Sequence, residues 1–273
     1  MSLETINQCG LVLLGCGKMG TAMLEGWLAN GVKPASVTII DPHPSERLIE
    51  LQADGLRVNV DLPPSPAICI LAVKPQMMGE ALPQIKALGN GATVFLSIAA
   101  GTPIATFEEV LGAKTPIIRA MPNTPAAVGR GITALIGNAL IDDTAMAMAE
   151  GLLQAVGQTV QLDSEDQMDA VTAVSGSGPA YVFHLIETLA AAGLAEGLPA
   201  DMAMQLAKAT VGGAGELAER AAEDPSTLRV NVTSPGGTTA AALGVLMNED
   251  RGFPALLREA VKAAADRSRE LRE

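Results

Sequence analysis

The chain has 273 residues, of which 48% are hydrophobic and 18% charged, so it can bury a sizeable core and form one large domain or two ordinary ones. Its formal net charge of −12 argues against a nucleic-acid partner, which would need clustered Lys and Arg side chains. The longest stretch rich in Ala and Leu, residues 182–198, is interrupted by His184, Glu187 and Glu196, so we expect no membrane span.

Three cysteines, Cys9, Cys16 and Cys69, indicate the redox compartment. They are an odd number without the spacing of a metal site, and they are predicted to be free thiols buried in or beside strands. No basic region followed by a long apolar run opens the sequence. We therefore expect a cytoplasmic protein without a metal centre.

Short apolar runs alternate with helical patterns over the first 120 residues. The runs are hydrophobic throughout rather than at every second position, which is typical of parallel strands covered on both faces. This alternation predicts an α/β domain with a doubly wound sheet of the Rossmann type. Strands are predicted at residues 10–14, 37–40, 56–60, 67–73, 93–98 and 117–120, and helices at residues 18–30, 45–53, 76–88 and 104–111.

The pattern changes after residue 163, where we place a boundary between a domain of residues 1–163 and one of residues 164–273. The second domain is predicted to be all-helical. Its helices are apolar around most of their circumference, which indicates that they bury against another subunit. Helices are predicted at residues 166–197, 199–222, 239–248 and 254–269. The first is interrupted at 176–179, and the second has Asp201 as its N-cap. A loop is predicted at 224–237.

A glycine-rich motif, G-C-G-K-M-G, follows the first predicted strand and opens the first predicted helix. Gly15 permits the tight turn, Gly17 lets the backbone approach a pyrophosphate, and Gly20 lets the helix pack against the strand. The alternative is a glycine turn without a ligand. The flanking strand and helix favour a dinucleotide site that includes Lys18 and Met19 at the helix start.

Asp41 ends the second predicted strand, where an acid can accept a hydrogen bond from the ribose 2′-hydroxyl of NADH. A carboxylate here repels the 2′-phosphate of NADPH, but His43 and Arg47 follow closely and could bind that phosphate. Asp41 could also be an ordinary turn residue before Pro42. The sequence favours NADH without excluding NADPH.

Three further segments, residues 73–75, 97–101 and 121–125, join a strand end to a turn constrained by Pro or Gly. The carboxyl ends of the strands form the ligand crevice of such a sheet. Asn123 lies between two prolines, so its amide could orient a carboxamide or a bound water. The predicted nucleotide contacts from these segments are Val73, Lys74, Pro75, Ala99 and Asn123.

The helical domain contains two stretches that are too rich in glycine for ordinary helix, residues 175–181 and 233–239. The second combines several hydroxyls with the start of a helix, where free backbone N–H groups bind anions. A capped helix after a glycine loop is the alternative, but capping needs only one Ser or Thr. The segment is therefore predicted to bind a small carboxylate.

Taken in chain order, these motifs resemble the pyrroline-5-carboxylate reductase family nearly from end to end, and the segment from Val232 to Thr239 is the most specific match. The resemblance implies reduction of 1-pyrroline-5-carboxylate, a small anionic cyclic imine, to L-proline by NADH or NADPH. It also implies dimers formed through the helical domain and often assembled into decamers. By the same resemblance, Ser234, Gly237, Thr238 and Thr239 bind the substrate, and Thr239 is the catalytic candidate.

Three other functions are compatible with parts of the sequence. Related hydroxyacid reductases usually need a catalytic lysine on the first helix of the second domain, but residues 163–197 contain no Lys or Arg. A nucleotide-binding scaffold without chemistry would not need the hydroxyls of residues 233–239. A six-membered cyclic imine stays open as a substrate, because one methylene group changes binding by only about 1–3 kcal/mol.

Overall fold

The computed structural model describes residues 2–271, which form two compact units. The sheet unit contains the residues up to Gly176 together with the end of the chain from Ala265, and the helical unit comprises Ser177–Ala264. The boundary between the two compact units lies after Gly176, because residues 164–176 pack beside the sheet. The functional division at residue 163 stays a prediction.

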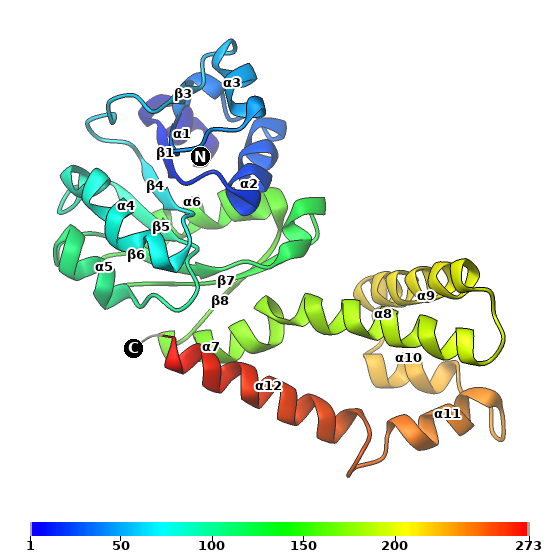
Figure 1. Cartoon of the computed structure of the whole chain (residues 1–273). Coiled ribbons are helices and arrows are strands. Elements are labelled where there is room, and N and C mark those ends of the chain that lie inside the picture. Colours follow the sequence, from blue (N-terminus) through cyan, green and yellow to red (C-terminus); the bar gives the residue numbers. More distant parts are fainter. Residues whose placement is uncertain (1, 272–273) are drawn as a thin grey trace. The chain divides into compact units, whose positions relative to one another are not determined.

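An eight-stranded sheet forms the centre of the sheet unit, in the order β3-β2-β1-β4-β5-β6-β7-β8 (Figure 1). Neighbouring strands are parallel except β6 and β7. The first six strands follow the doubly wound order of dinucleotide-binding domains, which confirms the predicted fold class. The strands are β1 (Leu11–Leu14), β2 (Val37–Ile40), β3 (Arg57–Val58), β4 (Ile68–Leu71), β5 (Val94–Ser97), β6 (Ile117–Met121), β7 (Gly131–Gly137) and β8 (Gly157–Gln161).

Strands β7 and β8 lie in a region, residues 126–163, for which the sequence pattern predicts no element. The six predicted strands are parallel to one another, as expected, whereas β7, for which the sequence makes no prediction, pairs antiparallel with β6. Only the short 3₁₀ turn Thr124–Val128 separates these two strands, and a parallel pair would need a much longer crossover.

Helices cover both faces of the sheet and enclose two hydrophobic cores. Along β1, Leu11 and Leu13 join the core that contains helices α2 and α6, whereas Val12 and Leu14 join the core that contains α4 and α5. A strand buried on both faces needs apolar residues at every position, which explains the continuous runs. The helices are α1 (Ser2–Cys9), α2 (Lys18–Ala29), α3 (Glu46–Gln52), α4 (Met78–Ile85), α5 (Ile104–Leu111), α6 (Asp143–Leu153) and α7 (Met168–Val171).

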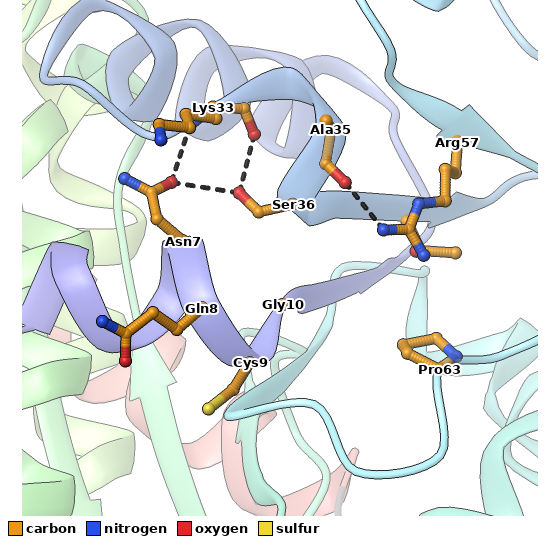
Figure 2. A pocket seen from close by; sticks show the side chains of 10 residues that line it. Asn7, Gln8, Cys9, Gly10, Lys33, Ala35, Ser36, Arg57 and Pro63 are labelled. Carbon is orange, nitrogen blue, oxygen red and sulfur yellow. Dashed lines mark hydrogen bonds between the residues drawn. The ribbon is translucent and has the colours of Figure 1, made fainter.

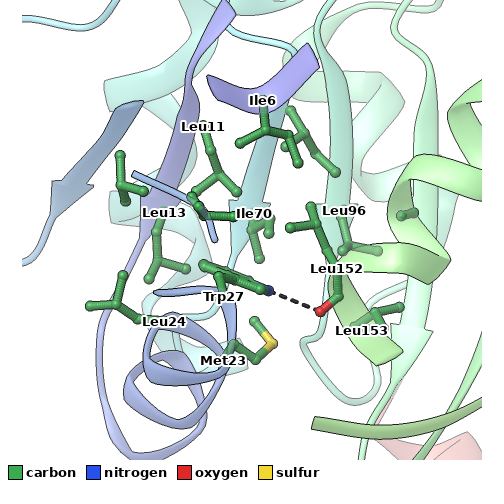
Figure 3. Packing of buried hydrophobic residues seen from close by; sticks show 14 of the residues in the cluster. Ile6, Leu11, Leu13, Met23, Leu24, Trp27, Ile70, Leu96, Leu152 and Leu153 are labelled. Atoms are coloured by element: carbon green, nitrogen blue, oxygen red, sulfur yellow. Dashed lines mark hydrogen bonds between the residues drawn. The ribbon is translucent and has the colours of Figure 1, made fainter. Parts of the chain in front are cut away.

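Trp27 on α2 is fully buried, and its indole Nε1 donates a hydrogen bond to the carbonyl oxygen of Leu152 at 2.9 Å (Figure 3). We expect Trp27→Phe to lower the free energy of unfolding by about 1–3 kcal/mol, because it removes this buried bond and leaves a void. Urea denaturation followed by circular dichroism measures the change. A loss below about 0.5 kcal/mol, the range of neutral surface substitutions, would contradict this role.

The helical unit and the end of the chain contain only helices within the described residues, as predicted. The expected N-cap at Asp201 is wrong, since α9 begins at Ala200 after Pro199 and Asp201 lies in its first turn. None of the helices within residues 2–271 is long and apolar enough to cross a membrane. The helices are α8 (Gly178–Ala195), α9 (Ala200–Arg220), α10 (Pro225–Asn231), α11 (Thr238–Leu246) and α12 (Phe253–Glu270).

Helix α10 lies inside the segment 224–237, so the prediction of a continuous loop there is wrong. Asp224 caps this helix by accepting the backbone N–H groups of Ser226 and Thr227, and Pro225 occupies the first helical position. Hydrogen bonds from the Ser226 hydroxyl and from Thr227 lower the pKa of Asp224 to about 2. The carboxylate is therefore ionised at neutral pH, which suits the positive end of the helix.

All three cysteines are free. Cys16 and Cys69 are buried, and burial raises the pKa of both thiols. Cys9 is exposed, so the expectation that all three are buried is wrong. The difference arises because α1 ends at Cys9 and the chain enters β1 only after the turn at Gly10, whose φ is 91°.

Candidate active site

The glycine-rich loop joins β1 to α2, as the motif predicts. Gly15 has a φ of 86°, and a Cβ on it would lie 2.7 Å from Val73 Cγ1. A Cβ on Gly20 would lie 2.7 Å from the carbonyl oxygen of Gly15. A Cβ on Gly17 would meet nothing within 4 Å, so its outer face is open. The first and third glycines therefore serve the packing of the turn, whereas the second leaves space for a ligand.

The first turn of α2 leaves backbone donors free for that ligand. No side chain caps this helix, whose N-cap is Gly17. Among the described residues, the N–H groups of Lys18, Met19 and Gly20 have no acceptor, and the first such bond runs from Thr21 to Gly17. Lys18 is exposed and Met19 partly exposed. Free N–H groups at the positive end of a helix make a phosphate site.

Asp41, just beyond β2, is half-buried and tied to the glycine-rich loop. Its Oδ2 accepts the backbone N–H of Cys16 at 2.6 Å, and its Oδ1 accepts the backbone N–H of His43 at 2.8 Å. The Asn59 amide binds both backbone polar groups of Asp41, at 2.9 and 2.8 Å. These bonds hold the carboxylate at the end of β2, next to the predicted phosphate site.

The three further segments follow β4, β5 and β6, so they lie at the same edge of the sheet as the glycine-rich loop. Val73 is half-buried, Lys74 and Pro75 are exposed, and the side chain of Ala99 is buried. Pro75 opens a 3₁₀ turn that leads into α4. The structure thus brings all the predicted nucleotide-binding residues to one edge of the sheet.

Asn123 uses its amide to join two segments of the sheet unit. Its Oδ1 accepts the N–H of Ile132 at 3.0 Å, and its Nδ2 donates to the carbonyl oxygen and the hydroxyl of Ser175, both at 3.3 Å. Ser175 belongs to a π-helical turn, Thr172–Gly176, a rare element that often marks functional sites. A contact between Asn123 and a nucleotide stays a prediction, since protein groups bind its amide in this structure.

Sequence reasoning missed an ion pair between a buried arginine and a partly exposed glutamate. Arg119 on β6 is 1% exposed, and its Nη1 donates to Glu165 Oε1 at 2.7 Å. The same carboxylate oxygen accepts the N–H of Ile104 at the start of α5, at 3.0 Å. A signal was present in the sequence, because an arginine in a continuously apolar strand needs a partner. The pair fixes the position of α5 next to residues 97–101.

The hydroxyl-rich segment of the helical unit joins α10 to α11, and Gly237 is the N-cap of α11. No side chain caps this helix. The N–H groups of Thr238, Thr239 and Ala240 have no acceptor among the described residues. The segment thus provides free backbone donors at a helix start, as expected for an anion site.

Three of the hydroxyls in the same segment also lack a partner among the described residues. Among the described residues, the hydroxyls of Ser234, Thr238 and Thr239 make no hydrogen bond, whereas Thr233 donates to the carbonyl oxygen of Arg229 at 2.6 Å. Ser234 and Thr238 are exposed, and Thr239 is partly exposed. Side-chain capping of α11 therefore does not account for these hydroxyls.

The described residues of each unit line a hollow. One of about 460 Å³ in the helical unit is lined by Thr233, Ala240 and other residues of α10 and α11, next to the hydroxyl-rich segment. The other, of about 150 Å³, lies at the amino ends of β1 and β2, opposite the nucleotide edge, and is lined by Asn7, Lys33 and Arg57 (Figure 2). No group of His, Cys, Asp and Glu within residues 2–271 is arranged to bind a metal ion.

Comparison with known families gives two matches. Residues 165–271 match the family model described as pyrroline-5-carboxylate reductase dimerisation. Residues 10–101 match the model described as NADP oxidoreductase, coenzyme F420-dependent. The two matches fall on the helical part of the chain and on the nucleotide half of the sheet.

Curated relatives match nearly the whole chain. Pyrroline-5-carboxylate reductase of Pseudomonas aeruginosa is 38% identical over 266 residues, covering 96% of this chain and 97% of the relative. The enzyme of the same name from Synechocystis sp. is 40% identical over 265 residues, with coverage of 96% and 97%.

Solved structures agree in fold over the same length. A pyrroline-5-carboxylate reductase from Coxiella burnetii superposes with a TM-score of 0.89 at 32% identity, covering 97% of this chain and 99% of the other. Plasmodium falciparum pyrroline carboxylate reductase with NADP bound has a TM-score of 0.83 at 30% identity, with coverage of 98% and 99%.

Proposed function

Because this chain belongs to the pyrroline-5-carboxylate reductase family, we infer that it reduces 1-pyrroline-5-carboxylate to L-proline with a hydride from NADH or NADPH. This is the last step of proline biosynthesis. Beyond the fold, the inference rests on two sets of backbone N–H groups that find no acceptor within residues 2–271, one at the start of α2 and one at the start of α11. The first suits a pyrophosphate and the second a carboxylate.

The nucleotide site of the sheet unit fits a dinucleotide. Open space at Gly17 and the free N–H groups of Lys18, Met19 and Gly20 would receive the pyrophosphate. The half-buried carboxylate of Asp41 would accept a ribose hydroxyl. The nicotinamide end would contact the three other strand ends, through Val73, Lys74, Pro75, Ala99 and Asn123.

The substrate-binding residues are proposed to lie in the α10–α11 segment of the helical unit. Ser234 and Thr238 would hold the substrate carboxylate by their hydroxyls and by the backbone N–H of Thr238, none of which has a partner among the described residues. Gly237, the N-cap without a side chain, would keep the start of α11 accessible to the carboxylate. Thr239 would hydrogen-bond near the ring nitrogen, directly or through water, and is the catalytic candidate. Helix α11 adds its positive end, which favours a small anion even in a chain of net charge −12.

The chemistry requires little acid catalysis from the protein. The nucleotide supplies the hydride, which attacks the imine carbon, and a proton on the imine nitrogen makes that carbon more electrophilic. The chain needs to align the two reactants and exclude water. Backbone amides, small hydroxyls and apolar walls suit this task, which explains why no His or Lys in the predicted sites is needed as a catalyst.

Product analysis tests this function. The chain is incubated with pyrroline-5-carboxylate and NADH, and chiral chromatography identifies the product. L-proline in amounts equal to the NADH oxidised supports the proposal, and a parallel reaction with the six-membered imine measures selectivity. Exclusive reduction of the six-membered imine would reject the five-membered substrate while keeping the imine reductase class.

The helical part of the chain self-associates, in line with the dimerisation model that it matches. We propose that the dimer forms through the helical unit, and that dimers assemble further into decamers. Its exposed large apolar side chains support this, since exposed apolar patches mark protein–protein interaction sites. These side chains include Phe183, Leu189, Leu206, Leu217 and Leu257.

Light scattering after size exclusion tests self-association. A chain of 27.9 kDa is expected to elute with at least twice that mass, because the exposed apolar surface is stabilised only in an assembly. Leu189→Asp, which introduces a charge into this surface, is expected to shift the distribution towards monomer. A wild-type chain that stays monomeric at micromolar concentration would contradict the proposed interface.

We also propose that the protein works in the reducing cytoplasm. All three cysteines are free thiols, and two of them are buried. Disulfides persist in oxidising compartments, whereas free buried thiols are typical of reducing ones.

A further inference from the structure

The turn after β2 decides whether a dinucleotide with a free ribose hydroxyl or one with a 2′-phosphate is accepted. Asp41 holds a carboxylate at this position, tied to Cys16 and His43 by bonds of 2.6 and 2.8 Å. An unmodified ribose can donate a hydroxyl hydrogen to the remaining lone pairs of this carboxylate. A 2′-phosphate carries up to two negative charges and only accepts, so it is repelled.

A nearby cation could reverse that preference, and Arg47 in the first turn of α3 is the strongest candidate. In the structure, however, two glutamates hold its guanidinium. Its Nε lies 2.7 Å from Glu25 Oε1, and its Nη2 donates to Glu25 Oε2 at 3.3 Å. Its Nη1 lies 3.4 Å from Glu50 Oε2. Because all three of its guanidinium nitrogens contact glutamate carboxylates, Arg47 has little capacity left to bind a phosphate.

The other charged groups of this region do not replace Arg47. Glu46 adds a further negative charge to α3, and Arg57 on β3 donates to the carbonyl oxygen of Ala35 at 2.8 Å. Lys18 opens α2 beside the proposed pyrophosphate site. His43 has an exposed side chain and is the remaining base in the turn. The balance of charge in this region is negative.

We propose that this chain prefers NADH to NADPH, and that Glu25 on α2 is a specificity-determining residue because it occupies Arg47. The proposal rests on the nucleotide site of the proposed reductase. Asp41 supplies the attraction for the ribose and the repulsion of the phosphate. Glu25 removes the cation that would otherwise compensate for that repulsion.

Direct binding to the full chain without substrate tests the proposal. Titration of NADH and NADPH, followed by the nicotinamide fluorescence of the bound nucleotide, gives two Kd values for each variant. For the wild type, the Kd for NADPH is expected to exceed that for NADH by about tenfold or more, since two like charges repel at close range. Equal values, or tighter binding of NADPH, would overturn the NADH preference.

The variant Glu25→Gln tests the role of Glu25. It is expected to tighten NADPH binding by about threefold to tenfold while leaving the Kd for NADH unchanged, because it frees Arg47. The double variant Glu25→Gln with Arg47→Gln is expected to lose that gain. Glu216→Gln, which disrupts a comparable exposed ion pair with Arg220 in the helical unit, is the matched control and is expected to change neither Kd.

The outcomes separate this proposal from the reductase function. An unchanged NADPH Kd in Glu25→Gln, or a gain that persists without Arg47, would reject the role of Glu25. Tight NADH binding without turnover of pyrroline-5-carboxylate would reject the reductase function and leave the nucleotide preference standing. Failure to bind either nucleotide would reject both.

Discussion

Gly17→Ala is expected to weaken the binding of NADH by about tenfold to a hundredfold. The added methyl group meets no protein atom within 4 Å, so the loop itself can accept it. It projects into the space assigned to the pyrophosphate and separates the phosphate from the free N–H groups of α2. Losing one such charge-assisted hydrogen bond removes about 1.5–3 kcal/mol of binding free energy. Isothermal titration calorimetry measures the loss.

Gly91→Ala is the matched control for this substitution. Gly91 lies in the turn before β5, at the amino edge of the sheet, and a Cβ there makes only an ordinary contact at 3.4 Å. Both variants are expected to keep the wild-type melting temperature, and only Gly17→Ala is expected to lose nucleotide affinity. Unchanged NADH binding in Gly17→Ala would mean that the pyrophosphate does not lie on this loop.

Thr239→Ala is expected to lower kcat/KM for pyrroline-5-carboxylate by about tenfold to a hundredfold. The hydroxyl has no partner among the described residues, so its removal leaves no protein group unsatisfied and should not affect folding. It would remove a hydrogen bond near the reacting nitrogen, which is worth about 1.5–3 kcal/mol when one partner is charged. Steady-state kinetics at saturating NADH measures the effect.

Thr239→Ser separates the hydroxyl from the shape of the side chain. It retains the donor and is expected to recover most of the activity, whereas the Kd for NADH stays at the wild-type value in both variants. Full turnover with unchanged KM in Thr239→Ala would show that Thr239 plays no part in the reaction.

The strands that carry the nucleotide site could be predicted because each is buried on both faces. Residues Leu11–Leu14 are apolar without exception, and a glycine-rich turn follows at once. Strand β8 could not be predicted in this way. Gly157–Gln161 lies at the edge of the sheet, is largely exposed and contains two glutamines, so it lacks the pattern of a buried strand.

Local signals and long-range contacts also explain which parts of the site could be predicted. The glycine-rich loop and the α10–α11 segment are contiguous, so their chemistry is visible in the order of residues. The bond from Cys16 to Asp41 and the ion pair between Glu25 and Arg47 join residues that are more than twenty positions apart. Such pairs depend on how α2, α3 and β2 pack, which no single segment determines. Helix α10, by contrast, could have been predicted from the sequence, because Asp224 followed by Pro225 is a local signal for the start of a helix.

The initial rate of absorbance loss at the nicotinamide band, with pyrroline-5-carboxylate and either NADH or NADPH, tests the central claim most directly. We expect rapid oxidation that depends on the imine and is faster with NADH. Oxidation with neither nucleotide, in a chain that demonstrably binds one of them, would contradict the assignment as a reductase of this imine.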